Sequence, residues 1–336
     1  MLANGKFLPL FSFLFGLGFA LQMLRAETRG VRFVPLYARR LLILFVFGLI
    51  HAVFLYNAEF LRKYAILGMV LLLFRICSPR ILLALAGIGL LYGVLSIERF
   101  TSSPEVDRQT ARANSQRSAV ARVDEEVSEE RSIRDRSRGT YTEIVAKRAK
   151  NELARYLRWQ FYVDESMIWQ LCFLLLGLYV GRRGILKNPE QHLPLLNKMM
   201  WWGLGVGLTA NLLQIAKWEL RDHNVDFLQG LNPRFLKTSA VMLTIFYVAG
   251  LTLLVQQASW RRLLQPVASA GRMALSNYVL QSVIMSTAFY GYGFGLYLKA
   301  SASLILILAL AAFAFEVLLS VWWLHRVQFG PLEWVW

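Results

Sequence analysis

Charged residues are scarce in this 336-residue chain. Asp, Glu, Lys and Arg make up 17% of it, while 56% is hydrophobic and the mean hydropathy is +0.44. Soluble domains usually carry about 25% charged residues. The apolar content exceeds what one water-soluble core of this length needs, so we expect the excess to face lipid.

Cysteine and the common nucleotide-binding motifs are nearly absent as well. Cys77 and Cys172 lie in or beside apolar stretches, and their spacing fits neither a disulfide framework nor a metal site. No metal is therefore expected. The chain has no P-loop, and the glycines of 291–295 do not follow a strand pattern. Soluble nucleotide chemistry is not supported.

Long apolar runs are what the sequence does contain. A membrane-spanning helix needs about 20 mostly apolar residues, and these runs lack the alternation of a lipid-facing barrel strand. Helices also satisfy every backbone group, as lipid requires. The sequence therefore predicts an all-α, polytopic transmembrane bundle of about nine helices, near residues 8–24, 38–57, 64–76, 81–97, 166–181, 197–216, 238–256, 272–290 and 300–324.

The net charge of +16 is explained by topology and needs no nucleic acid partner. Residues 98–165 hold 14 Lys and Arg against 13 Asp and Glu, so the excess lies in the other loops. Cytoplasmic loops are rich in Lys and Arg. The five arginines in 25–40 place the first loop in the cytoplasm, and alternation then puts the later basic clusters on that side too.

This alternation of loops between the two sides of the membrane predicts a multi-pass protein of the bacterial inner membrane with three parts. Residues 1–97 hold helices one to four, 98–165 form an extracytoplasmic polar segment, and 166–336 hold helices five to nine and a cytoplasmic tail. The N-terminus then lies outside. A helix that starts outside without a signal peptide usually follows another helix. We therefore expect that a preceding transmembrane helix is missing and that the complete protein has ten helices.

The polar segment divides into two parts. Residues 101–138 have no aromatic residue and too little apolar surface to offset chain entropy, so we expect disorder or loose helix. Residues 140–162 space apolar side chains at helical intervals among basic ones. They predict an amphipathic helix, which either lies in the membrane interface or packs on the bundle.

Three ionisable residues near the second apolar run are candidates for catalysis. His51 lies within the run, where an ionisable group is a functional candidate, and imidazole suits a general base. Arg40 comes eleven residues earlier and projects from nearly the same face. Glu59 lies at the outer boundary. The structural alternatives are a histidine hydrogen-bonded between helices, a topology anchor and a solvated loop carboxylate, respectively.

The last two apolar runs carry candidate substrate-binding residues. Asn277 and Gln281 are one turn apart, so they could line a polar cavity; joining helices by hydrogen bonds is the commoner role. Glu316 lies deep in the last run, where a carboxylate must be paired or protonated. We expect it to face the bundle interior.

Four ordered stretches resemble the YeiB-like bacterial membrane proteins, a family known as domain of unknown function 418. They are FLPLFSFLFGLGFALQM (7–23), RRLLILFVFGLIHAVFLYNAEFLRKYAILG (39–68), GRMALSNYVLQS (271–282) and FGPLEWVW (329–336). Members of the family generally begin with a helix bearing an Asp-x-x-Arg-Gly motif, which this chain lacks. The resemblance thus agrees with a missing first helix.

The resemblance implies acyl transfer, because this family is grouped with transmembrane acyltransferases. His51 would be the base or transient acyl acceptor, with Arg40 at a spacing seen in acyltransferase-3 proteins. Glu59 stands where the family more often has Gly-Asp. The donor would be a cytoplasmic acyl-CoA such as acetyl-CoA, and the acceptor an extracytoplasmic glycan or lipid. A transporter or lipid flippase, and a non-catalytic envelope scaffold, remain the alternatives; the oligomeric state is not specified.

Overall fold

The computed structural model describes residues 7–56, 60–95, 137, 139–157, 165–219, 234–297 and 299–335. Within these residues every regular element is helical, with eleven α-helices and short 3₁₀ turns. The all-α class predicted from the apolar runs is therefore confirmed. The expectation of disorder in 101–138 concerns residues outside this set, apart from Ser137.

Each of the nine apolar stretches contains a helix. They are α1 (Phe7–Thr28), α2 (Phe33–Phe54), α3 (Leu61–Leu73), α4 (Pro79–Leu95), α7 (Glu165–Arg183), α8 (Leu193–Glu219), α10 (Arg234–Gln256), α12 (Ala274–Phe289) and α13 (Ala302–Leu324). Within the described residues, four helical stretches are long and apolar enough to cross a membrane: Phe7–Thr28, Phe33–Phe54, Thr238–Gln256 and Ala302–Leu324.

Two further helices are amphipathic. Helix α6 (Tyr141–Leu157) occupies the polar segment, where an amphipathic helix was predicted. Helix α11 (Ala258–Arg272) was not predicted. Its arginines belong to the basic clusters that were expected in a cytoplasmic loop, although Trp260, Leu263 and Val267 recur at helical spacing. None of its residues is buried.

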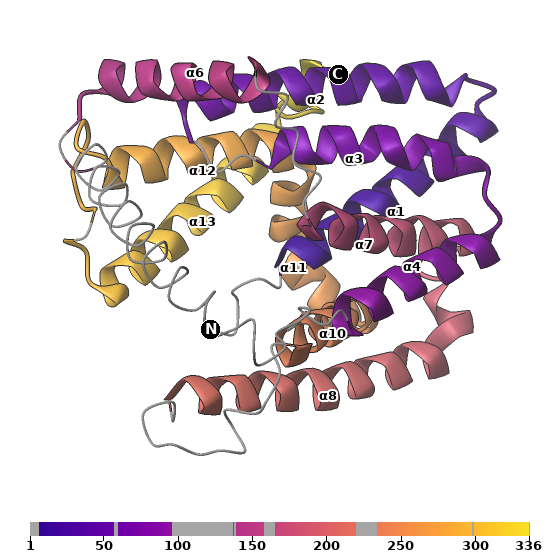
Figure 1. The fold of residues 1–336 in the computed structure, drawn as a ribbon. Coiled ribbons are helices and arrows are strands. Elements are labelled where there is room, and N and C mark those ends of the chain that lie inside the picture. The colour runs from indigo at the N-terminus through magenta and orange to yellow at the C-terminus, as the bar shows by residue number, and fades with distance from the viewer. Residues whose placement is uncertain are drawn as a thin grey trace, which may run out of the picture. The chain divides into compact units, whose positions relative to one another are not determined.

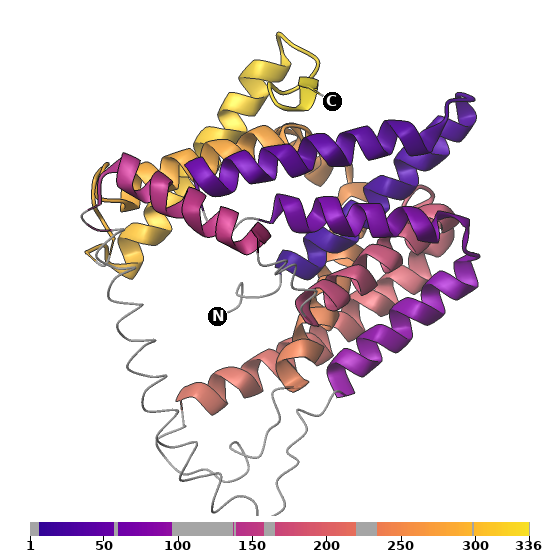
Figure 2. The same ribbon diagram turned by 45° about the horizontal axis from the view of Figure 1, so that its top comes forward.

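The chain divides into two compact units. The first contains residues 1–45, 60–96 and 162–265, and the second contains 46–59, 97–161 and 266–336. In the first unit, α1 packs along α7, α7 along α4, and α8 along α10 (Figures 1 and 2). The second unit holds the end of α2 together with α6, α12 and α13.

Small residues allow the helices of the first unit to approach closely. A Cβ on Gly16 of α1 would overlap the Leu174 carbonyl of α7, and one on Gly177 would overlap the Phe13 carbonyl of α1. Gly203 of α8 faces the backbone of Phe246 in the same way. Gly177 and Gly203 each begin a Gly-x-x-x-Gly pattern, which is typical of helix pairs in membranes.

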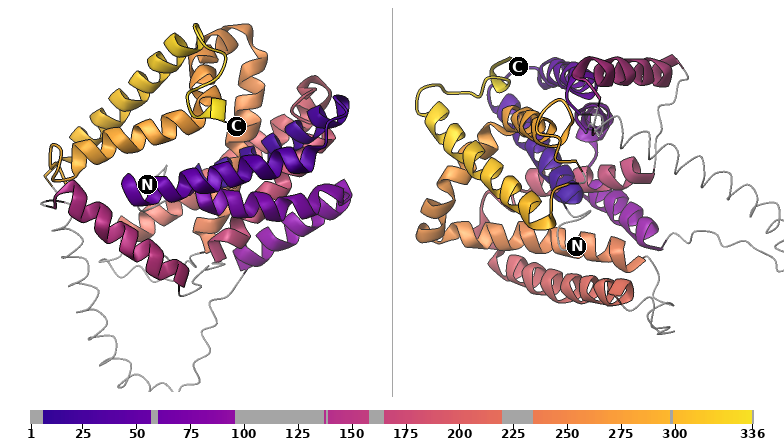
Figure 3. Two further views of the ribbon diagram at one scale, coloured as in Figure 1. Left: turned by 90° about the horizontal axis from the view of Figure 1, so that it is seen from above. Right: turned by 90° about the vertical axis from the view of Figure 1, so that its left-hand side faces the viewer.

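In the second unit, α12 and α13 form an antiparallel hairpin (Figure 3). Asn277, near the start of α12, donates a hydrogen bond to Ser320, near the end of α13, at 2.9 Å. Glu333, beyond α13, caps the N-terminus of α12: its carboxylate accepts from the backbone N–H groups of Leu275 and Ser276 at 2.8 and 3.0 Å. The carboxylate thus satisfies donors that a helix start leaves unpaired.

Candidate functional site

His51 lies in the last turn of α2 and is almost completely buried, with 2% of its surface exposed. The helix persists here because the residues on both sides, Leu-Ile before and Ala-Val-Phe after, are apolar and without glycine or proline. It ends just beyond, where the backbone N–H groups of Leu55 and Tyr56 both donate to the His51 carbonyl. A titratable ring is thereby fixed next to a helix C-terminus.

The imidazole is oriented by α12. Its Nε2 lies 2.8 Å from the Ser282 hydroxyl, and its ring lies over the ring of Tyr278, with 4.8 Å between centroids. The Ser282 hydroxyl also donates to the Tyr278 carbonyl at 3.0 Å. Because serine has one hydroxyl proton, Nε2 must carry the imidazole proton if both bonds form.

This tautomer leaves a lone pair on Nδ1. Among the described residues Nδ1 has no hydrogen-bond partner, and it is buried. The opposite tautomer would leave an unpaired buried N–H, which costs about 1–3 kcal/mol. We therefore assign the proton to Nε2 from the hydrogen-bond network. A histidine held this way can accept a proton or bond to an electrophile through Nδ1.

Arg148 of α6 is the cationic group beside this histidine. It is buried, and its Nη1 donates to the Leu55 carbonyl at 2.9 Å. Its guanidinium lies over the ring of Tyr290, 5.1 Å from the centroid, and interacts electrostatically with His51. The Tyr141 hydroxyl donates to the Phe54 carbonyl at 3.2 Å, so two bonds hold α6 on this end of α2.

Arg40 and Glu59, the other two predicted catalytic residues, are not among the residues described around His51. Arg40 lies three turns before His51 on α2, and its Nη1 donates to the Gln22 side chain of α1 within the first unit. Glu59 lies outside the described residues, so its position does not enter the site.

The three predicted substrate-binding residues have different surroundings. Asn277 is buried and joins α12 to α13 through Ser320 and to the Ala270 carbonyl, which fits the helix-joining alternative. Gln281 is exposed. Glu316 is buried one turn before Ser320, and among the described residues its Oε1 has no hydrogen-bond partner.

Sequence reasoning missed Arg148 and the pairing of His51 with Ser282. Ser282 lies in the same apolar run as Asn277 and Gln281, and nothing in the sequence connects it with a histidine 231 residues away. Arg148 was counted among the basic residues of an amphipathic helix. The sequence signal that could have placed Arg148 on the packed face of this helix is its helical spacing from the apolar residues Tyr141 and Ile144.

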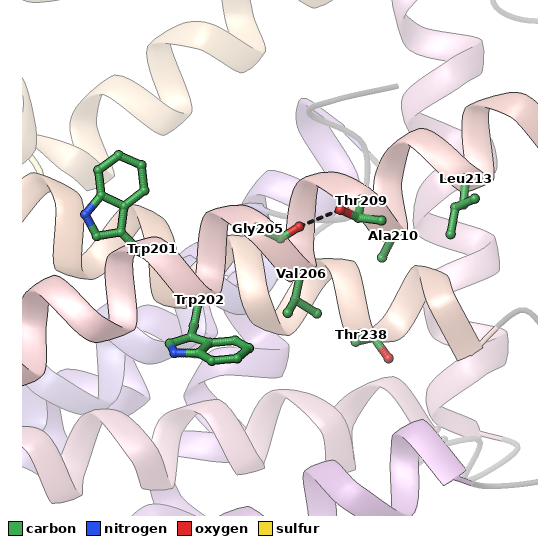
Figure 4. Close-up of a pocket in the computed structure, with 8 residues that line it drawn as sticks. All are labelled: Trp201, Trp202, Gly205, Val206, Thr209, Ala210, Leu213 and Thr238. Atoms are coloured by element: carbon green, nitrogen blue, oxygen red, sulfur yellow. Dashed lines mark hydrogen bonds between the residues drawn. The ribbon is translucent and has the colours of Figure 1, made fainter.

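A separate apolar pocket of about 530 Å³ lies in the first unit (Figure 4). The indoles of Trp201 and Trp202 lie at one end, and Leu213 and Thr238 at the other. The Thr209 hydroxyl donates to the Gly205 carbonyl of its own helix at 2.8 Å, so the pocket offers few free polar groups. It suits an apolar chain better than a polar substrate.

Helical composition and apolar helices long enough to span lipid define a membrane-associated helical protein. Residues 180–336 match the family described as "Protein of unknown function (DUF418)". The chain is 32% identical to uncharacterised protein YxaH of Bacillus subtilis over 98% of its own length and 78% of YxaH. It belongs to this YeiB-like family of uncharacterised proteins.

Two further relatives cover nearly the whole chain. An uncharacterised 39.9 kDa protein encoded in the amylase 3′ region of Bacillus acidopullulyticus is 31% identical over 99% of this chain and 79% of its own. YeiB of Escherichia coli is 28% identical over 100% of this chain and 82% of its own. No solved structure matches the chain.

Proposed function

We propose that this protein is a multi-pass acyltransferase of the bacterial inner membrane. It would move an acyl group from a cytoplasmic acyl-CoA to an acceptor outside the membrane, with His51 at the reacting centre. The supporting observation is the buried imidazole of His51, whose Nε2 is held by Ser282 while Nδ1 keeps its lone pair. A base oriented by a second residue is the usual arrangement for acyl transfer.

In the proposed reaction Nδ1 takes the proton of an acceptor hydroxyl as the hydroxyl oxygen attacks the thioester carbonyl. The new C–O bond forms, the C–S bond breaks, and the proton passes from the imidazole to the CoA sulfur. Alternatively the imidazole itself accepts the acyl group first, through an N–C bond, and the acceptor hydroxyl then attacks that carbonyl. Label retained on His51 would identify the second route.

In the proposed orientation the acyl-CoA enters from the cytoplasmic side so that its thioester reaches His51, and the acceptor approaches His51 from the opposite side. All nine apolar helices would cross the membrane, the basic loops would lie in the cytoplasm, and α6 with the C-terminal end of α2 would lie outside. His51 would then be near the acceptor side. Membrane lipids would surround the helices, and the acceptor would be an envelope glycan or lipid.

The test is transfer of radiolabelled acetyl from acetyl-CoA in membranes that contain the full chain, followed into protein, lipid and glycan fractions. We expect His51→Ala to abolish transfer and leave membrane insertion intact. His325→Ala, which removes an exposed histidine at the end of α13, is the matched control and should retain activity. Undiminished transfer by His51→Ala would rule out the assignment.

Transport is the second candidate, and it depends on Glu316. A buried carboxylate with an unpaired oxygen among the described residues is costly and suits a proton or cation pathway. In proteoliposomes, Glu316→Gln should then change how substrate flux depends on pH. A flat response would leave transport without its main support.

A further inference from the structure

Arg148 occupies a site that has more hydrogen-bond donors than the surrounding residues use. The side chain is 7% exposed, and a guanidinium has five N–H donors in a planar fork. One nitrogen donates to the Leu55 carbonyl. Among the described residues no carboxylate pairs with Arg148, and no other hydrogen bond to its side chain is formed.

Within the described residues, the printed contacts of the Arg148 guanidinium are with one carbonyl and one aromatic ring. The Leu55 carbonyl belongs to the C-terminal end of α2, which carries a partial negative charge, and the Tyr290 ring presents its π face. Neither supplies a full counter-charge. A buried charge normally requires an ion-pair partner. The remaining N–H donors of Arg148 therefore suit an anionic ligand that is not part of the chain.

The position of Arg148 connects this anion to the chemistry of His51. Leu55, which anchors the guanidinium, is one helical turn after His51. An anionic group bound to Arg148 would therefore lie near the end of α2 that carries His51.

We propose that Arg148 forms an anion-binding site that takes a phosphate or carboxylate group of the acyl acceptor. The guanidinium fork matches the paired oxygens of either group. The acceptor hydroxyl is then presented to His51. The anion-binding site is inferred from the contacts of Arg148 alone. Its role in holding an acyl acceptor rests on the proposed acyl transfer.

Binding is measured on the purified full chain in detergent by thermal unfolding with four probes. Glycerol 3-phosphate and glucuronate carry the two anionic groups, and glycerol and glucose are their neutral counterparts. We expect the anions to raise the unfolding temperature and the neutral probes to leave it unchanged. The more stabilising of the two anions identifies the acceptor group as phosphate or carboxylate.

Three variants locate the site. Arg148→Met should weaken anion binding at least tenfold, and Arg148→Lys should weaken it less, because lysine keeps the charge without the fork. Lys150→Met removes an exposed positive charge from the same helix and should bind as the unchanged protein does. If Arg148→Met unfolds, Arg148→Lys still reports the loss of the fork.

The outcomes separate this site from the acyl-transfer proposal. Anion binding retained by His51→Ala supports the site even if no acetyl is transferred. Equal binding by Arg148→Met and the unchanged protein would overturn it. A double-mutant cycle on stability that couples Arg148→Met strongly to Glu59→Gln would also overturn it, because the guanidinium would then be paired with that carboxylate.

Discussion

The Ser282 hydroxyl lies 2.8 Å from Nε2 of His51, across 231 residues of sequence. Two of the four stretches that carry the family resemblance, 39–68 and 271–282, therefore meet at one hydrogen bond. A third, 329–336, contacts the second of these through Glu333 and Ser276. Stretches far apart in the chain are brought together around α12.

Removing the Ser282 hydroxyl should slow acyl transfer without abolishing it. In Ser282→Ala, Nε2 loses its partner, so the ring tautomer and orientation are no longer fixed. In a Ser-His-Asp triad, losing the carboxylate's control of the histidine tautomer lowers kcat by about 10⁴, and we expect a smaller fall for a neutral serine. Acetyl transfer should fall in kcat, with little change in the KM for acetyl-CoA.

The control for this variant is Ser286→Ala, one turn further along α12. The Ser286 hydroxyl donates to the Val283 carbonyl of its own helix. Its loss should leave the rate unchanged. Equal rates for Ser282→Ala and Ser286→Ala would show that Ser282 has no role in the reaction.

Gly16 and Gly18 provide a matched pair for the packing of α1 on α7. A Cβ at Gly16 would overlap the Leu174 carbonyl, whereas nothing lies within 4 Å of one at Gly18. Gly16→Ala should destabilise the protein by about 1–3 kcal/mol, the usual cost of overpacking. Gly18→Ala should be neutral or slightly stabilising. Thermal unfolding in detergent compares them, and equal unfolding temperatures would contradict the close contact.

Loss of the Glu333 carboxylate should destabilise the second unit. Glu333→Ala leaves the N–H groups of Leu275 and Ser276 without their acceptor, and losing a helix cap costs about 0.5–2 kcal/mol. Glu27→Ala, at the exposed end of α1, is the control and should have no effect. An unchanged unfolding temperature in Glu333→Ala would show that the cap does not stabilise the fold in solution.

The membrane orientation is testable with single cysteines. With Cys77 and Cys172 replaced by alanine, Ser102→Cys should react with a membrane-impermeant maleimide in intact cells. Lys187→Cys, which is exposed between α7 and α8, should react only after the membrane is opened. The reverse pattern would invert the proposed topology.

Helix type and position were predictable from the sequence because a single apolar run in lipid can satisfy its own backbone polar groups only as a helix. The boundaries were less accurate. Helix α2 starts at Phe33 rather than near residue 38, because the residues before Arg39 can still be helical: Pro35 lies in the first turn, where proline breaks no hydrogen bond within the helix. Helix α11 was missed because its sequence is mixed in polarity and contains Pro266.

The sequence by itself determined that this chain is helical, rich in apolar helices and provided with a histidine inside one of them. Composition and periodicity are local properties, so they can be read without the fold. Only the tertiary structure decided what surrounds that histidine. Ser282 and Tyr278 contact it from α12, and Arg148 of α6 bonds to the Leu55 carbonyl one turn later. Such contacts depend on how distant helices pack, which local pattern does not encode.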